Sequence, residues 1–232
     1  MTSLLFEHRR RHLLLELTTE SDALPRRMAL MLVTIVACGA FYGAVLGSWH
    51  GPKLSLYVAA KIPMLLISTA AVTALFNYVA SALLGLQLRF RQVFAMTLLP
   101  LAIAAIAAAS VAPAAWIFSA SLPTPSPAQR TLHNLMYLIQ VSIIGLAGYV
   151  GTSRLGGSLR EITGLPSMAR KIRFSWIVAY AFVGGEMAWI LRPFVGSVYL
   201  PVEFIRDDAL RGNVYEFIVT DIVPHLLRTL SG

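Results

Sequence analysis

Long apolar stretches without a charged residue make up much of the chain. Four of them cover 28–52, 62–88, 92–129 and 131–153. A helix needs about 20 apolar residues to cross the hydrocarbon core of a bilayer, and each stretch is long enough. With a further apolar stretch near the C-terminus, they predict an all-α integral membrane bundle of about five transmembrane helices. The expected helices cover about 28–48, 62–86, 93–120, 132–152 and 174–194.

The third stretch is longer than one span requires. The segment Pro123–Pro127 ends it, because clustered prolines cannot continue a helix. The remainder is too short for two spans, so we expect one long helix that is bent or interrupted near Pro100 and Pro113. Membrane helices tolerate such prolines when neighbouring groups satisfy the freed carbonyls.

Composition supports a membrane protein. Of the 232 residues, 57% are hydrophobic and 13% are charged, and the mean hydropathy is +0.70. Soluble domains are about 25% charged. The single cysteine, Cys38, excludes an internal disulfide and a thiolate metal cluster.

The distribution of Lys and Arg predicts the topology. Loops on one side of the five expected helices carry twelve basic residues, and the short loops on the other side carry Lys53, Lys61 and Arg130. Because basic loops stay in the cytoplasm, we expect a cytoplasmic N-terminus and an outer C-terminus, which in a bacterium places the protein in the inner membrane. The twelve are Arg9, Arg10, Arg11, Arg26, Arg27, Arg89, Arg91, Arg154, Arg160, Arg170, Lys171 and Arg173. They flank membrane helices and form no single groove-sized patch, so nucleic acid is not an expected partner.

Two amphipathic segments flank the membrane domain (28–196). Residues 1–27 combine leucines with Arg9, Arg10 and Arg11, which suggests an interfacial helix with its arginines toward anionic lipid headgroups. The alternative is a basic flank that serves topology alone. In the tail, 197–232, Asn213 and Glu216 resemble a helix N-cap and its partner, so we expect a short amphipathic helix on the outer surface.

Small residues at fourfold spacing predict close helix contacts. Gly39, Gly43 and Gly47 put a smooth groove on one face of the first expected helix. The groove serves either packing within the chain or self-association, and the spacing does not distinguish the two.

Charged residues in or beside the membrane helices are the candidate functional or structural groups. Such a residue costs roughly 2.5–3.5 kcal/mol to insert, so it needs a partner or a purpose. Arg192 precedes Pro193 and should pair with an acidic residue of the tail, Glu203, Asp207 or Asp208. Lys61 is expected at the start of the second helix, on the same outer side, and we expect Glu186 to form an ion pair with it. The alternatives are a cation or proton path, with Asn77, Gln140 and His133 as polar companions, and simple interfacial placement.

No motif for catalysis is present. The chain has no phosphate-binding glycine loop, no H-E-x-x-H and no G-x-S-x-G. We therefore expect no enzymatic activity, no cofactor and no metal site.

Three stretches carry a resemblance to a known family. They are AKIPMLLISTAAVTALFNYVASALLG (60–85), YAFVGGEMAWILRPFVGS (180–197) and GNVYEFI (212–218). Together they resemble a family of uncharacterised bacterial polytopic inner-membrane proteins, with Lys-x-Pro opening one span and W-x-L-R-P-F ending the last. The architecture is also loosely similar to Yip1-type proteins. The resemblance implies location and fold, and no reaction. A glutamine commonly stands in that family where Glu186 stands here, which weakens a claim that a carboxylate is essential.

The sequence thus favours a non-enzymatic membrane subunit or scaffold that binds membrane lipids, another membrane protein or a second copy of itself. A small transporter or ion pathway that uses Glu186 is the alternative.

Overall fold

The computed structural model describes residues 23–122, 139, 142–153, 159–160, 163–196 and 201–217. These residues form helices and connecting turns, with no β-strand. The expected interfacial helix with Arg9, Arg10 and Arg11 lies outside them. So do the first part of the expected fourth helix and the end of the tail.

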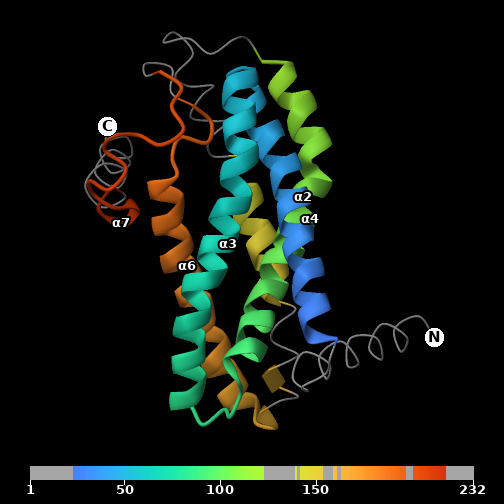
Figure 1. The fold of residues 1–232 in the computed structure, drawn as a ribbon, viewed down its shortest axis with the longest axis vertical. Helices are drawn as coiled ribbons and strands as arrows, with labels where there is room; N and C mark the ends of the chain where they lie inside the picture. Colours follow the sequence, from blue (N-terminus) through green and yellow to red (C-terminus); the bar gives the residue numbers. More distant parts are fainter. Residues whose placement is uncertain are drawn as a thin grey trace, which may run out of the picture.

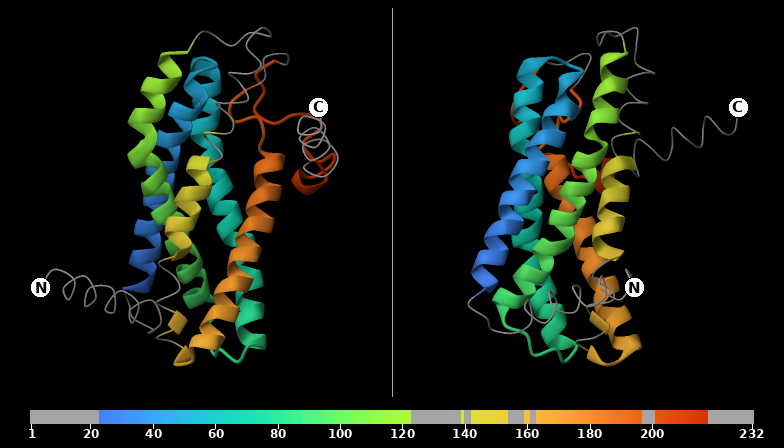
Figure 2. Two further views of the ribbon diagram at one scale, coloured as in Figure 1. Left: turned by 180° about the vertical axis from the view of Figure 1, so that it is seen from behind. Right: turned by 90° about the vertical axis from the view of Figure 1, so that its right-hand side faces the viewer.

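Helices lie side by side along one long axis (Figure 1). α2, α4 and α6 run in one direction and α3 runs in the other. A further helical segment, 142–153, lies beside α4 (Figure 2). The bounds are α2 Leu24–Ser48, α3 Pro52–Leu83, α4 Phe90–Ala120, α6 Pro166–Ile190 and α7 Val214–Phe217.

Three helices of the described chain, α2, α3 and α4, are long and apolar enough to cross a membrane. The protein is therefore a helical membrane protein. The helix α6 carries Arg173 and Glu186 and is not among the three. Membrane crossings by α6 and by the segment 142–153 stay predictions from the sequence.

The second membrane helix begins ten residues before the expected position 62. Gly51 has a φ of +116°, which allows the tight turn after α2, and Pro52 then fits the first turn of α3. The expectation that Lys61 opens this helix is wrong, because Lys61 lies inside α3. Pro63 also lies in the helix interior, where a membrane helix tolerates it.

The fourfold glycine spacing of α2 meets α3. Gly39, Gly43 and Gly47 are all buried along this contact. A Cβ atom at Gly47 would lie 2.7 Å from the carbonyl oxygen of Leu54, and one at Gly43 would clash with the carbonyl of Val58. The glycines therefore let two backbones touch within one chain, and α3 covers this face against a second copy.

The two ends of the bundle differ in charge. The end that holds 23–27, 84–91, 159–160 and 163–173, called the basic end below, has basic and no acidic residues among those described. The opposite end, called the flap end, holds the chain reversal after α6 and the segment 201–217, the C-terminal flap. The flap contains Glu203, Asp207, Asp208 and Glu216 as well as Arg206 and Arg211.

The glycine contact predicts unequal effects for two identical substitutions. Gly43→Ala should destabilise the bundle by about 1–3 kcal/mol, because the new methyl group overlaps the backbone of α3. Gly148→Ala is the matched control: no atom lies within 4 Å of the added Cβ, and alanine favours a helix by up to about 1 kcal/mol. Thermal unfolding in mild detergent measures the stability of both variants. An unchanged unfolding transition for Gly43→Ala would contradict the close contact between α2 and α3.

Candidate functional site

Two sequence motifs meet at the flap end. Lys61 comes from the interior of α3, and the residues Trp189 to Phe194 form the end of α6 and the loop that follows. α6 ends at Ile190 because the residue before a proline is disfavoured in the helical conformation, and Arg192 precedes Pro193. The chain then turns across the end of the bundle, which brings the loop against α3.

Lys61 is completely buried, with no exposed surface. Its Nζ donates a hydrogen bond of 3.0 Å to the carbonyl oxygen of Pro193. The rings of Phe194 and Phe204 flank the ammonium, with centroids 5.9 Å and 5.5 Å from Nζ. Burial of a cation is unfavourable unless polar partners replace water, and the carbonyl dipole and the two aromatic rings do so here.

The expected ion pair between Lys61 and Glu186 is not formed. Lys61 bonds to the loop beyond the end of α6, whereas Glu186 lies half-buried one turn before that end. Glu186 instead acts on Tyr215 of the flap: burial raises the pKa of the Tyr215 hydroxyl, and the nearby carboxylate of Glu186 raises it further. The neutral hydroxyl donates to the carbonyl of Ala181 at 3.0 Å.

Arg192 fastens the flap to α6. One of its guanidinium nitrogens, Nη1, donates to the carbonyl of Trp189 at 2.9 Å, and the other, Nη2, donates to the backbone carbonyl and carboxylate of Asp208, both at 3.2 Å. The guanidinium carbon also lies 3.8 Å from the centroid of the Trp189 ring. Asp208 is one of the three acidic residues expected as partners of Arg192. Planar stacking together with forked donors is a geometry that lysine cannot reproduce.

Further contacts hold the flap at other points. The indole nitrogen of Trp189 donates to the carbonyl of Arg211 at 3.3 Å. Tyr57 of α3 meets Phe204 edge to face at 5.3 Å. In the flap helix α7, the side chain of Asn213 accepts the backbone N–H of Glu216, which is the N-cap that the spacing predicts. The flap is therefore tied to both α3 and α6.

A buried polar stripe on α3 lies between Lys61 and the basic end. Its members repeat every fourth residue and are at least 96% buried: Thr69, Thr73, Asn77 and Ser81. Asn77 donates to the hydroxyl of Thr97 at 3.2 Å, and Tyr180 of α6 donates to the Thr97 carbonyl at 2.8 Å. The three hydroxyl groups of the stripe and the side-chain carbonyl of Asn77 have no hydrogen-bond partner among the described residues.

Of this stripe, only Asn77 was among the residues expected from the sequence to have a role. A signal was available, because the fourfold spacing continues from Lys61 through Leu65 to the four polar residues. At about 100° per residue, successive members lie about 40° apart, so each shares a face with its neighbours and the row winds slowly around α3. Ser and Thr are common at close contacts between membrane helices, where polar side chains also bond across helices.

Metal chemistry has no support in the described part of the chain, where no group of three or more His, Cys, Asp or Glu side chains converges. Comparison with known proteins adds no assignment, since no family model, curated protein or solved structure matches the chain. The proposals below therefore rest on geometry and charge.

The contacts of Arg192 predict how strongly the flap is held. Arg192→Met should remove the bonds to Asp208, and flap amides should then exchange with solvent about fivefold faster, equivalent to about 1 kcal/mol for a partly exposed pair. Arg211→Gln removes one positive charge from the exposed side of the same flap and should leave exchange unchanged. Hydrogen–deuterium exchange with mass spectrometry measures the exchange rates of the flap amides in both variants. Equal rates in wild type and Arg192→Met would show that Arg192 does not hold the flap.

Proposed function

We propose that the protein is a non-enzymatic subunit or scaffold of a bacterial inner membrane, and that its C-terminal flap binds another membrane protein. The contacts of buried Lys61 and half-buried Arg192 support this proposal. Lys61 and Arg192 are committed to contacts within the chain, which leaves them as supports for the flap and not as reacting groups.

The charge difference between the two ends supports the orientation. The basic end concentrates arginine at three separate points of the chain, and basic flanks stay in the cytoplasm. The flap would then lie on the outer side of the membrane, where residues of both signs are present.

The surface of the flap is the observation on which partner binding depends. Leu210 is 83% exposed and Ile205 is 47% exposed, although the flap is fixed to the bundle by Arg192, Trp189 and Phe204. A fixed segment outside the lipid that displays apolar side chains beside charged ones is typical of a protein contact with an apolar centre and a polar rim. Fixing the segment in advance also lowers the entropy cost of binding.

Partner binding predicts a specific loss on substitution of the flap. Ile205→Asp with Leu210→Asp should remove a stoichiometric partner from the protein purified from native membranes in mild detergent, because two carboxylates would be buried in the contact. Leu165→Asp at the basic end is the control, since Leu165 is also exposed and apolar, at 57%. Native mass spectrometry gives the mass of the complex and separates a different protein from a second copy. Purification of the wild type as a monomer without a partner would refute the proposal.

The polar stripe of α3 favours a second candidate, a small transporter or ion pathway. Four polar side chains on α3 have atoms without a partner among the described residues, and Glu186 lies half-buried on the neighbouring α6. From Lys61 to Ser81 the helix rises about 30 Å, which equals the thickness of the hydrocarbon core.

This candidate predicts a flux that depends on both elements. In proteoliposomes loaded with a pH-sensitive dye, wild-type protein should pass protons, and both Glu186→Gln and Asn77→Leu should reduce the rate at least about tenfold. Leu75→Gln on the exposed face of α3 is the control for altered polarity, since Leu75 is 58% exposed. Absence of flux in the wild type, or unchanged flux in both variants, would eliminate a proton pathway.

A further inference from the structure

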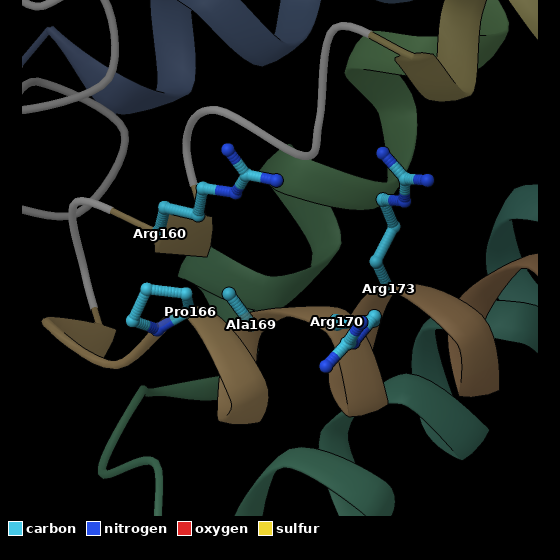
Figure 3. A pocket seen from close by; sticks show the side chains of 5 residues that line it. All are labelled: Arg160, Pro166, Ala169, Arg170 and Arg173. Atoms are coloured by element: carbon cyan, nitrogen blue, oxygen red, sulfur yellow. The ribbon is translucent and has the colours of Figure 1, made fainter.

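A hollow lined by three arginines lies at the basic end, which is the end of the bundle opposite the flap. Its volume is about 180 Å³, and its lining residues are Arg160, Pro166, Ala169, Arg170 and Arg173 (Figure 3). A water needs roughly 10–15 Å³ of comparable space, so the hollow admits a much larger group. Arg160 comes from the segment before α6, and the other four residues come from the first turns of α6 itself.

The charges that line the hollow have no counter-charge in the described part of the chain. The side chains of Arg160, Arg170 and Arg173 are exposed, and none forms a hydrogen bond or an ion pair with a described residue. Each guanidinium carries five N–H donors in a planar fork, a geometry that suits the oxygens of a phosphate group. Buried Ala169 forms part of the wall and leaves the space between the longer side chains open.

An apolar surface continues directly from the hollow along α6. Phe174 follows Arg170 by four residues and Ile177 follows Arg173 by four, so each apolar side chain lies one turn further along the same helix face. Val178 extends this surface by another turn. Phe174, Ile177 and Val178 are 67%, 36% and 50% exposed. A ligand with a phosphate group at one end and a hydrocarbon chain at the other matches both parts of this surface.

We propose that the arginine hollow binds the phosphate headgroup of one anionic phospholipid, whose acyl chain lies against Phe174, Ile177 and Val178. The shared chemistry is a phosphate group, and the apolar surface assigns it to a lipid in preference to a free phosphate. The inference rests on the proposed membrane location but not on partner binding by the flap.

Titration of dioctanoyl phosphatidic acid onto the full chain in phosphatidylcholine nanodiscs tests the proposal, with heat measured by calorimetry and empty nanodiscs subtracted. Wild-type protein should show one saturable site. Arg160→Gln/Arg170→Gln/Arg173→Gln should weaken binding at least about tenfold, and Arg170→Gln alone about fivefold, because each substitution removes charge-assisted hydrogen bonds to the phosphate.

A second triple variant controls for overall charge. Arg26→Gln/Arg91→Gln/Lys171→Gln removes the same three charges from exposed side chains of the same end, none of which lines the hollow. It should change the affinity less than about threefold. An equal loss in both triple variants would reduce the effect to general electrostatics and overturn the site. Wild-type affinity in the first triple variant would overturn it as well.

Glycerol 3-phosphate and inorganic phosphate, titrated in the same nanodiscs, separate the two sources of phosphate. Neither should bind at the concentrations that saturate the site with phosphatidic acid, because neither has an acyl chain. Equal affinity for either would overturn the lipid assignment. The first triple variant should still co-purify with the flap partner, so failure of lipid binding and failure of partner binding are read separately.

Discussion

The hydrogen bond from the Lys61 ammonium to the Pro193 carbonyl organises the flap end of the protein. A fully buried cation requires polar groups around it, and here a backbone carbonyl and two aromatic rings supply them. The carbonyl is available only because α6 stops before Pro193 and the chain turns toward α3. Pro193 therefore ends α6, and the buried Lys61 holds the loop that leads from α6 into the flap.

The flap depends on this arrangement in turn. Phe204 contacts both the ammonium of Lys61 and the ring of Tyr57, so the start of the flap rests on α3. Arg192, next to the proline that bonds Lys61, holds the middle of the flap through Asp208. The charges of Lys61 and Arg192 therefore hold the flap in place at one end of the bundle.

Packing within the membrane follows a different rule from packing in water. Lipid is as apolar as the side chains, so close backbone contact and polar bonds between helices replace the hydrophobic effect. α2 and α3 touch through Gly43 and Gly47, and α3 bonds to α4 through the amide of Asn77 and the hydroxyl of Thr97. In the polar stripe, the amide of Asn77 forms such a bond, whereas its side-chain carbonyl and the three hydroxyl groups have no partner among the described residues.

Hydropathy and fourfold spacing are local properties of the chain, so the helical class, the apolar helices and the glycine contact face could be predicted from the residues alone. The sequence also narrowed the partners of Arg192 to three acidic residues. It could not identify the partner of Lys61: an ammonium accepts any nearby carboxylate, carbonyl or ring, and sequence spacing does not say which is near. The partner of Lys61 depends on where α3 starts and how the loop after α6 crosses it, and both follow from the three-dimensional packing of distant segments. The same holds for the arginine hollow, whose members come from two segments that only the fold brings together.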